Sequence, residues 1–334
     1  MPARLVLPTV ALAALVGAGC SADVPPPEPP QEPAPLVGPA PPYDDSLEPA
    51  EAVLAFVPAT ATTVTVTDFD EVRAQLGVPD LTSDDLMTDR FAFWERADAV
   101  APLLTEGLLR PYASELWLDH DFSQDDVDWE ARFTGPDGSG FVLGMRPDLD
   151  LDRVAGAIEA GVGPLADAEL LRDAGLVVSG VPEPEEPVWA NDEAWAELLP
   201  DDPAAATYLR QGCVPLEQAL GPDADAEVQG EVLAAVPVTS LDELDRFAVA
   251  FGDNNATVRL GSGRDDLFTR VAAGRAWPVP DFGRHFRDGV GDPGTGRIGY
   301  AVPDPPRAAR LTLLEELPFA ICPDVLPIPE PTGL

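Results

Sequence analysis

Apolar and polar residues alternate along several short stretches of the chain, and each such stretch predicts a β-strand. Residues 62–67 alternate valine with threonine, which is typical of a strand with one buried face. Asp68 comes directly after this stretch and can cap a helix that the apolar spacing predicts over 69–76. Residues 129–145 contain two apolar stretches around glycine-rich turn residues at 135–138, and this pattern predicts a β-hairpin.

Helical spacing of apolar residues predicts further helices. Asp150 can open a helix whose apolar residues recur over 151–158, and a short apolar stretch at 175–179 then predicts a third strand. Another helical pattern covers 105–118, where Pro111 should kink or split the helix because proline has no amide hydrogen to donate.

The second half of the chain partly repeats the order of elements in the first half. A Ser-x-Asp-acid sequence stands before the first hairpin strand of each half, at Ser123 and at Ser240, and we expect a capped turn at both. An Arg-Val-Ala sequence follows each hairpin, at Arg153 and Arg270, and a strand at 297–302 would complete the second set. Duplication of one supersecondary unit would leave this shared order. Chance recurrence of common elements is the alternative.

These patterns predict an α+β fold, built from two related units of antiparallel strands with helices packed on one face. A single continuous sheet built from both halves is the alternative arrangement. The expected organisation is a signal peptide at 1–19, a Pro-rich acidic tether at 20–47, one unit at 48–180, a linker at 181–190, a second unit at 191–322 and a Pro-rich tail at 323–334.

The first twenty residues carry an export signal. Arg4 supplies one positive charge, residues 5–19 are mostly apolar, and small residues lead into Cys20. This stretch resembles the lipobox of bacterial lipoproteins, although Gly17 stands where those sequences prefer leucine. The resemblance implies signal cleavage, lipid modification of Cys20, and a protein anchored in the cell membrane on the extracytoplasmic face. An ordinary cleaved secretion signal is the alternative, and the apolar run is too short to span a bilayer.

The residues between this signal and the first predicted strand are rich in proline and acidic side chains. Such a composition cannot form a packed core and favours extended polyproline II. At roughly 3.1 Å per residue, the tether could hold the folded part up to about 80 Å from the membrane.

The charge of the chain narrows the classes of partner. A net charge of −39 would repel nucleic acid and anionic lipid, so we expect neither as a partner. The twenty basic residues are all arginine. Mechanisms that need a catalytic lysine, such as Schiff-base chemistry, are therefore excluded. We expect no cofactor.

Three cysteines are present, and Cys20 is assigned to the lipid. We expect Cys213 and Cys322 to form a disulfide, because an exported protein folds in an oxidising compartment and two thiols remain. Two buried, unpaired cysteines are the alternative.

One acidic segment resembles the calcium-binding loop of EF-hands in its oxygen-bearing residues, which are Asp119, Asp121, Ser123, Asp125 and Glu130. It departs from that pattern at Gln124, where the loop needs glycine for a sharp turn. The Ser-x-x-acid sequence within it is a capping signature. We therefore expect a capped, solvated turn rather than a calcium site.

The chain has two histidines, His120 and His285, so sites built from three histidines are excluded. Asp281 and Asp288 lie close to His285 in sequence and could orient it as a general base. This leaves an extracytoplasmic hydrolase using Asp/His chemistry, with or without a divalent cation, as the alternative function. Because the usual catalytic motifs are absent, we expect a non-catalytic lipoprotein that binds a protein or a small ligand.

Overall fold

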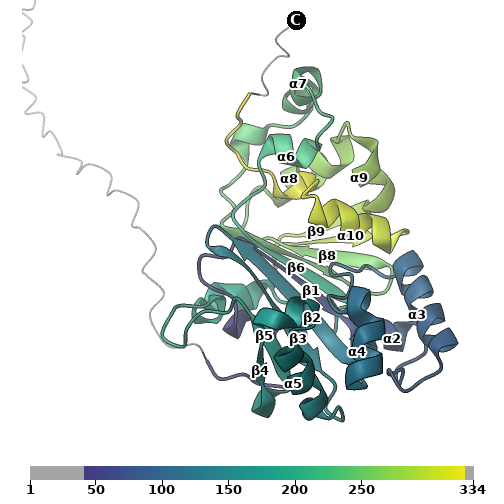
Figure 1. The fold of residues 1–334 in the computed structure, drawn as a ribbon. Helices are drawn as coiled ribbons and strands as arrows, with labels where there is room; N and C mark the ends of the chain where they lie inside the picture. Colours follow the sequence, from purple (N-terminus) through teal and green to yellow (C-terminus); the bar gives the residue numbers. More distant parts are fainter. Residues whose placement is uncertain (1–40, 328–334) are drawn as a thin grey trace, which may run out of the picture. The chain divides into compact units, whose positions relative to one another are not determined.

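The protein is an α+β molecule built on one ten-stranded sheet, in which every neighbouring pair of strands is antiparallel (Figure 1). The computed structural model describes residues 41–327, so the predicted signal peptide, Cys20 and most of the tether lie outside the described residues. The strand order is β4-β5-β3-β2-β1-β6-β7-β8-β10-β9. The strands are β1 (Thr63–Asp68), β2 (Val127–Gly135), β3 (Gly138–Met145), β4 (Glu169–Leu171), β5 (Leu176–Ser179), β6 (Ala206–Gln211), β7 (Arg246–Phe251), β8 (Asn255–Arg259), β9 (Arg287–Asp292) and β10 (Arg297–Ala301).

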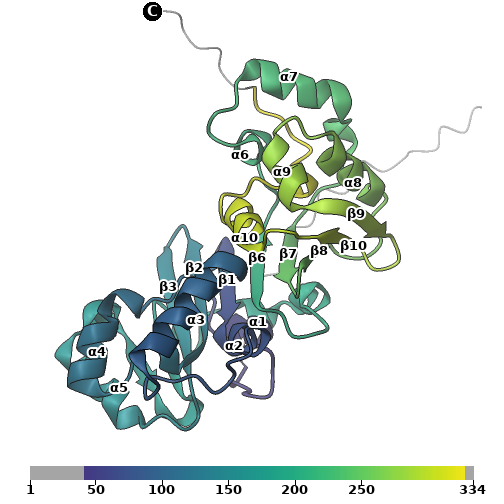
Figure 2. The ribbon, with the colours of Figure 1, turned by 90° about the vertical axis from the view of Figure 1, so that its right-hand side faces the viewer.

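The longer helices cover one face of this sheet (Figures 1 and 2). Leu143 and Val177 point to that face in the first half, and Phe247 and Val249 do so in the second. The α-helices are α1 (Pro49–Ala52), α2 (Phe69–Gln75), α3 (Met87–Val100), α4 (Ala113–His120), α5 (Leu151–Ala160), α6 (Leu216–Leu220), α7 (Ala226–Ala235), α8 (Leu267–Ala276), α9 (Pro280–His285) and α10 (Pro305–Leu313).

The opposite face of the sheet carries a thinner apolar layer. Val64 of β1 and its cross-strand partner Leu209 of β6 both point into it. Trp189 and Trp195 belong to short 3₁₀ segments and stack there with their ring centroids 3.9 Å apart. Strand residues therefore alternate between a helical layer and this second layer, as period-2 side-chain placement requires.

The two halves share one topology. The first half has the strand order β1-β2-β3-β5-β4, and the second half has the corresponding order β6-β7-β8-β10-β9. The halves meet where β1 pairs with β6, so the single continuous sheet is the arrangement that occurs. Arg153 donates to the carbonyl oxygen of Asp121 and Arg270 to that of Asp242, both at 2.7 Å. In each half this arginine ties the helix after the hairpin to the loop before it.

The local predictions have mixed outcomes. Asp68 caps α2 as expected, because its carboxylate accepts a hydrogen bond from the amide of Glu71 at 3.0 Å. Ser123 caps the 3₁₀ turn before β2 as expected, but this turn is buried rather than solvated, and the expected cap at Ser240 is wrong. Ser240 ends a 3₁₀ turn, and its hydroxyl donates to the carbonyl oxygen of Pro237. The expected break at Pro111 is confirmed, since Pro111 lies in a 3₁₀ turn and α4 begins only after it, whereas residues 105–109 are not helical.

The Cys213–Cys322 disulfide is confirmed, with the two Cα atoms 5.0 Å apart. Two backbone hydrogen bonds lie beside it, from Val214 N to Ala320 O at 2.8 Å and from Cys322 N to Val214 O at 2.9 Å. The disulfide therefore fixes the segment after β6 to the end of the second half. Within residues 41–327, no helix has the length and apolar character needed to cross a bilayer.

Replacing both Cys213 and Cys322 with serine should lower the free energy of unfolding by about 3–5 kcal/mol. The disulfide joins residues 109 positions apart, and opening so long a loop raises the conformational entropy of the unfolded chain. Urea denaturation monitored by tryptophan fluorescence measures this loss. Wild-type protein unfolded with a reductant should match the double variant, and equal stability of oxidised wild type and double variant would contradict the prediction.

Candidate functional site

Ser123 and Asp125, two residues of the segment that resembles a calcium-binding loop, are engaged by protein donors. Asp125 is buried, and its carboxylate accepts hydrogen bonds from Arg90 Nε at 2.6 Å, Trp94 Nε1 at 2.8 Å and Ser123 Oγ at 2.7 Å. Arg90 also donates to Ser123 Oγ at 2.8 Å. These bonds occupy both carboxylate oxygens and fix α3, which carries Arg90 and Trp94, against the turn before β2.

The remaining residues of that loop point to different surroundings. Asp119 is exposed on α4, and Asp121 ends α4 in a left-handed conformation with φ of 54°. Glu130 is buried on β2, where it accepts hydrogen bonds from Leu108 N at 2.6 Å and Arg132 Nε at 2.8 Å. In the part of the chain that the structure describes, no three or more His, Cys, Asp or Glu residues are grouped to hold a metal ion.

The histidine candidates also lie apart from their expected partners. Asp281 forms an ion pair with Arg284 at 3.0 Å, and Asp288 adopts a left-handed conformation near the start of β9. His285 Nδ1 lies 3.9 Å from an oxygen of Asp304, the residue that caps α10. The carboxylate that approaches His285 is therefore not one of the two that the sequence predicted.

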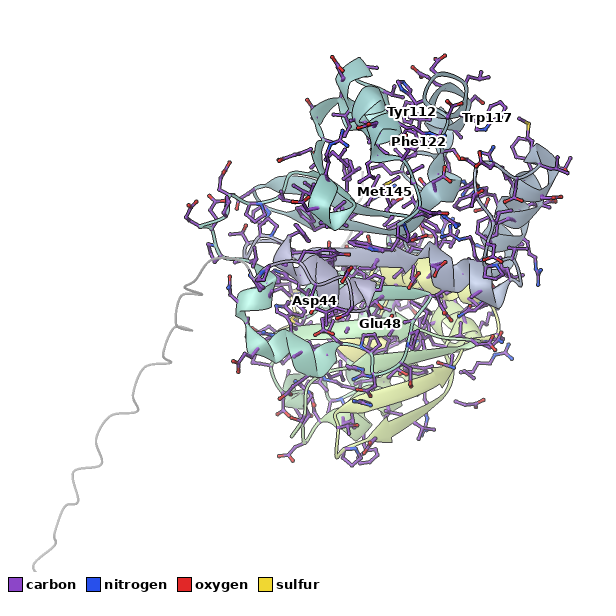
Figure 3. The ribbon with its side chains drawn as sticks, turned by 90° about the horizontal axis from the view of Figure 1, so that it is seen from below. Asp44, Glu48, Tyr112, Trp117, Phe122 and Met145 are labelled. Atoms are coloured by element: carbon purple, nitrogen blue, oxygen red, sulfur yellow. A yellow bond between two sulfur atoms is a disulfide. The ribbon has the colours of Figure 1, made fainter. Side chains whose placement is uncertain are left out.

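The surface feature that stands out is a groove between α3 and α4, with a volume of about 330 Å³. Met87 and Phe91 of α3 form one wall, and Trp117 and Leu118 of α4 form the other. In Figure 3, Tyr112 and Trp117 lie together in this helical layer, whereas Asp44 and Glu48 lie away from it. The floor contains Trp94 and the buried pair Arg90 and Asp125.

Large apolar side chains gather at this groove. Of the fourteen that are exposed in the described part of the chain, four line the groove: Met87, Phe91, Trp117 and Leu118. Phe91 and Leu118 are 67% and 69% exposed, so much of each of these wall side chains extends beyond the groove into solvent. Soluble proteins rarely expose large contiguous apolar patches unless these bind something.

A polar contact at one end of the groove joins its walls. Arg110, which precedes α4, forms two hydrogen bonds of 2.8 Å with the carboxylate of Asp98 on α3. Its guanidinium group also lies 4.3 Å from the ring centroid of Trp94. Paired hydrogen bonds of this kind restrict how far α3 and α4 can move relative to each other. The Arg110–Asp98 contact at one end and the Arg90–Asp125 pair at the floor therefore maintain the shape of the groove.

A second, polar cavity of about 600 Å³ lies near the ends of β1 and β2. Asp68 and Asp128 line it, and burial raises the pKa of Asp68 to about 7 and that of Asp128 to about 6. Arg73 lies 2.7 Å from Asp128 and partly offsets the effect of burial on its pKa. Both carboxylates already have structural partners, since Asp68 caps α2 and Asp128 binds Arg73.

No protein-family model, curated protein or solved structure matches this chain.

The sequence patterns did not predict the groove, because they did not predict α3. Phe93, Trp94 and Ala97 of this helix face the core, whereas Met87 and Phe91 are exposed. A helix with apolar residues on two faces does not show the single apolar stripe by which an amphipathic helix is recognised in a sequence. One sequence feature could have indicated the exposed apolar residues of α3. The segment from Leu86 to Trp94 contains more large apolar residues than one buried helix face requires.

Replacing Asp68 with asparagine should change how stability depends on pH. Burial, with smaller contributions from Asp70, Glu48 and Glu71, raises the pKa of Asp68 to about 7, whereas the unfolded value lies near 3.8. The folded protein therefore holds this proton between about pH 4 and pH 7 while the unfolded chain has lost it, so the free energy of unfolding of wild type falls as pH rises through this range. The asparagine side chain can still accept the capping bond but does not titrate.

Urea denaturation at pH 5 and pH 8 measures this effect. The stability of the Asp68→Asn variant relative to wild type should rise by a few kcal/mol between these pH values, since each unit of pKa shift is worth about 1.4 kcal/mol. A constant difference between the two proteins across this range would contradict the raised pKa.

Proposed function

We propose that this chain is a lipoprotein, anchored through Cys20 on the extracytoplasmic face of a membrane, and that its folded part binds another protein without catalysis. The binding site in this proposal is the groove between α3 and α4. The observation that carries it is the concentration of exposed apolar side chains at the groove, where Phe91 and Leu118 on the two walls are 67% and 69% exposed. Covering them would remove apolar surface from water, which favours association.

The shape of the patch favours a protein over a small ligand. Small-molecule sites usually enclose most of the ligand within a concave pocket. Here Phe91 and Leu118 line the groove but remain 67% and 69% exposed, so much of each side chain lies outside it. A small molecule between the walls would leave these outer parts in water, whereas a protein surface could cover the groove and both walls together.

The surroundings of the groove support binding rather than catalysis. The polar groups at its floor, Arg90 and Asp125, are paired with each other at 2.6 Å. Arg110 at its edge is likewise paired with Asp98. Groups whose hydrogen bonds are already made hold the walls in place and are poorly suited to transfer protons to a bound molecule.

Replacing Cys20 with alanine should release the protein from membranes or block its maturation, because the lipid is attached to that thiol. Membrane fractionation with mass spectrometry of the mature N-terminus measures this outcome. An unmodified N-terminus in wild-type protein that is still retained in membranes would contradict lipid anchoring.

A photo-reactive phenylalanine analogue placed at Phe91 should form one discrete protein adduct when the native envelope is irradiated. The same analogue at Phe268, which is 60% exposed on α8, is the matched control and should not form it. Leu118→Ser in the same chain should abolish the adduct at position 91. Identical adducts from positions 91 and 268, or an adduct that Leu118→Ser leaves unchanged, would contradict binding at the groove.

A further inference from the structure

We infer that the partner segment is an amphipathic α-helix with basic residues beside its apolar face. This inference rests on the proposed function and specifies the chemistry of the partner. It depends on two further observations, which are the helical walls of the groove and the charge of its rims.

The walls of the groove have the geometry that receives a helix. Met87 and Phe91 are four residues apart on α3, and Ser114 and Leu118 are four residues apart on α4, so each wall presents a ridge of neighbouring side chains. Two helical ridges with a groove between them can pack against the ridge of a third helix. Recognition of this kind uses apolar anchors at i, i+3, i+4 and i+7 of the bound helix.

The rims of the groove carry unpaired negative charge. Glu95 is exposed one helical turn after Phe91, and Glu115 is exposed three residues before Leu118. Among residues 41–327, neither of these carboxylates has an arginine or histidine within ion-pair distance.

The arginines near the groove do not offset this charge. Arg90 and Arg110 are ion-paired with Asp125 and Asp98, respectively. Arg96 lies on the other side of α3, where it donates to the carbonyl oxygen of Leu76 at 2.9 Å. A partner with lysine or arginine beside its apolar face would therefore meet complementary charge, whereas an acidic helix or an anionic lipid surface would be repelled.

The test uses three synthetic helical peptides of equal length and the complete folded protein. The first peptide has leucines at i, i+3, i+4 and i+7 with lysines beside them. The second keeps the leucines and has glutamates in place of the lysines. The third has the composition of the first in scrambled order, which keeps the charge but removes the apolar face. Fluorescence anisotropy of labelled peptide measures each dissociation constant at physiological salt.

The lysine peptide should bind wild-type protein at least tenfold more tightly than either of the other two. The double variant Phe91→Ser/Leu118→Ser should lose at least tenfold of this affinity, while Phe268→Ser, an exposed aromatic residue elsewhere, should leave it unchanged. Glu95→Gln/Glu115→Gln should weaken binding of the lysine peptide several-fold and should not weaken binding of the glutamate peptide, because the repulsion of its carboxylates is reduced. Circular dichroism checks that each variant is folded.

The other outcomes separate this inference from the proposed function. Equal, groove-dependent binding of the lysine and glutamate peptides would overturn the basic character of the partner while leaving the groove as a binding site. Equal binding of the scrambled peptide, insensitive to Phe91→Ser/Leu118→Ser, would show attraction by net charge alone and overturn the inference. Binding to phosphatidylcholine vesicles that is lost in Phe91→Ser/Leu118→Ser would identify a lipid surface as the occupant and also overturn it.

Discussion

The pairing of β1 with β6 is the interaction on which the whole arrangement depends. Five pairs of residues meet along it, from Thr63 opposite Arg210 to Thr67 opposite Ala206. Each half contributes the strand at its inner edge, so neither half leaves that edge with unpaired backbone groups. Val64 and Leu209 meet across the same junction and join the apolar layer on the face opposite the longer helices. The pairing of β1 with β6 therefore makes both the sheet and this apolar layer continuous across the two halves.

The groove is built outward from the first half of this sheet. The turn before β2 presents Asp125, and the carboxylate of Asp125 holds α3 through Arg90 and Trp94. A buried charge is costly unless it is paired, and breaking such a pair typically costs about 3–5 kcal/mol. The position of α3 is thus fixed by a contact that the fold must keep. Rigid walls of this kind reduce the entropy that is lost when a partner binds.

The parts of the fold that the sequence predicted are those determined by neighbouring residues. β1 and α5 carry clear periodicity, and their capping residues Asp68 and Asp150 mark where helices begin. The edge strand β9 was missed because Gly289 and Gly291 interrupt any apolar alternation. The disulfide could be predicted by counting thiols. By contrast, the β1–β6 junction brings together residues far apart in the chain, and no local pattern records such a pairing.

The candidate site was hidden for a related reason. Met87 and Phe91 are apolar residues that do not serve the core, so a search for buried faces places them wrongly or not at all. Two acidic residues that the sequence singles out have structural roles. Asp125 binds Arg90 of α3, and Glu130 accepts a hydrogen bond from the amide of Leu108, in the segment before α4. These acidic residues therefore stabilise the fold. The exposed apolar residues of α3 and α4 have no such role in the fold.

The shared topology of the halves has a consequence for stoichiometry. A duplicated fold would ordinarily offer two equivalent places to bind, one on each half. The connection between β1 and β2 contains α3 and α4, whereas the corresponding connection between β6 and β7 contains α6 and α7, on which Leu233 is the large apolar residue that is exposed. The similarity of the two halves of the sheet does not extend to the helices on its surface, so the proposed binding site occurs once in each chain.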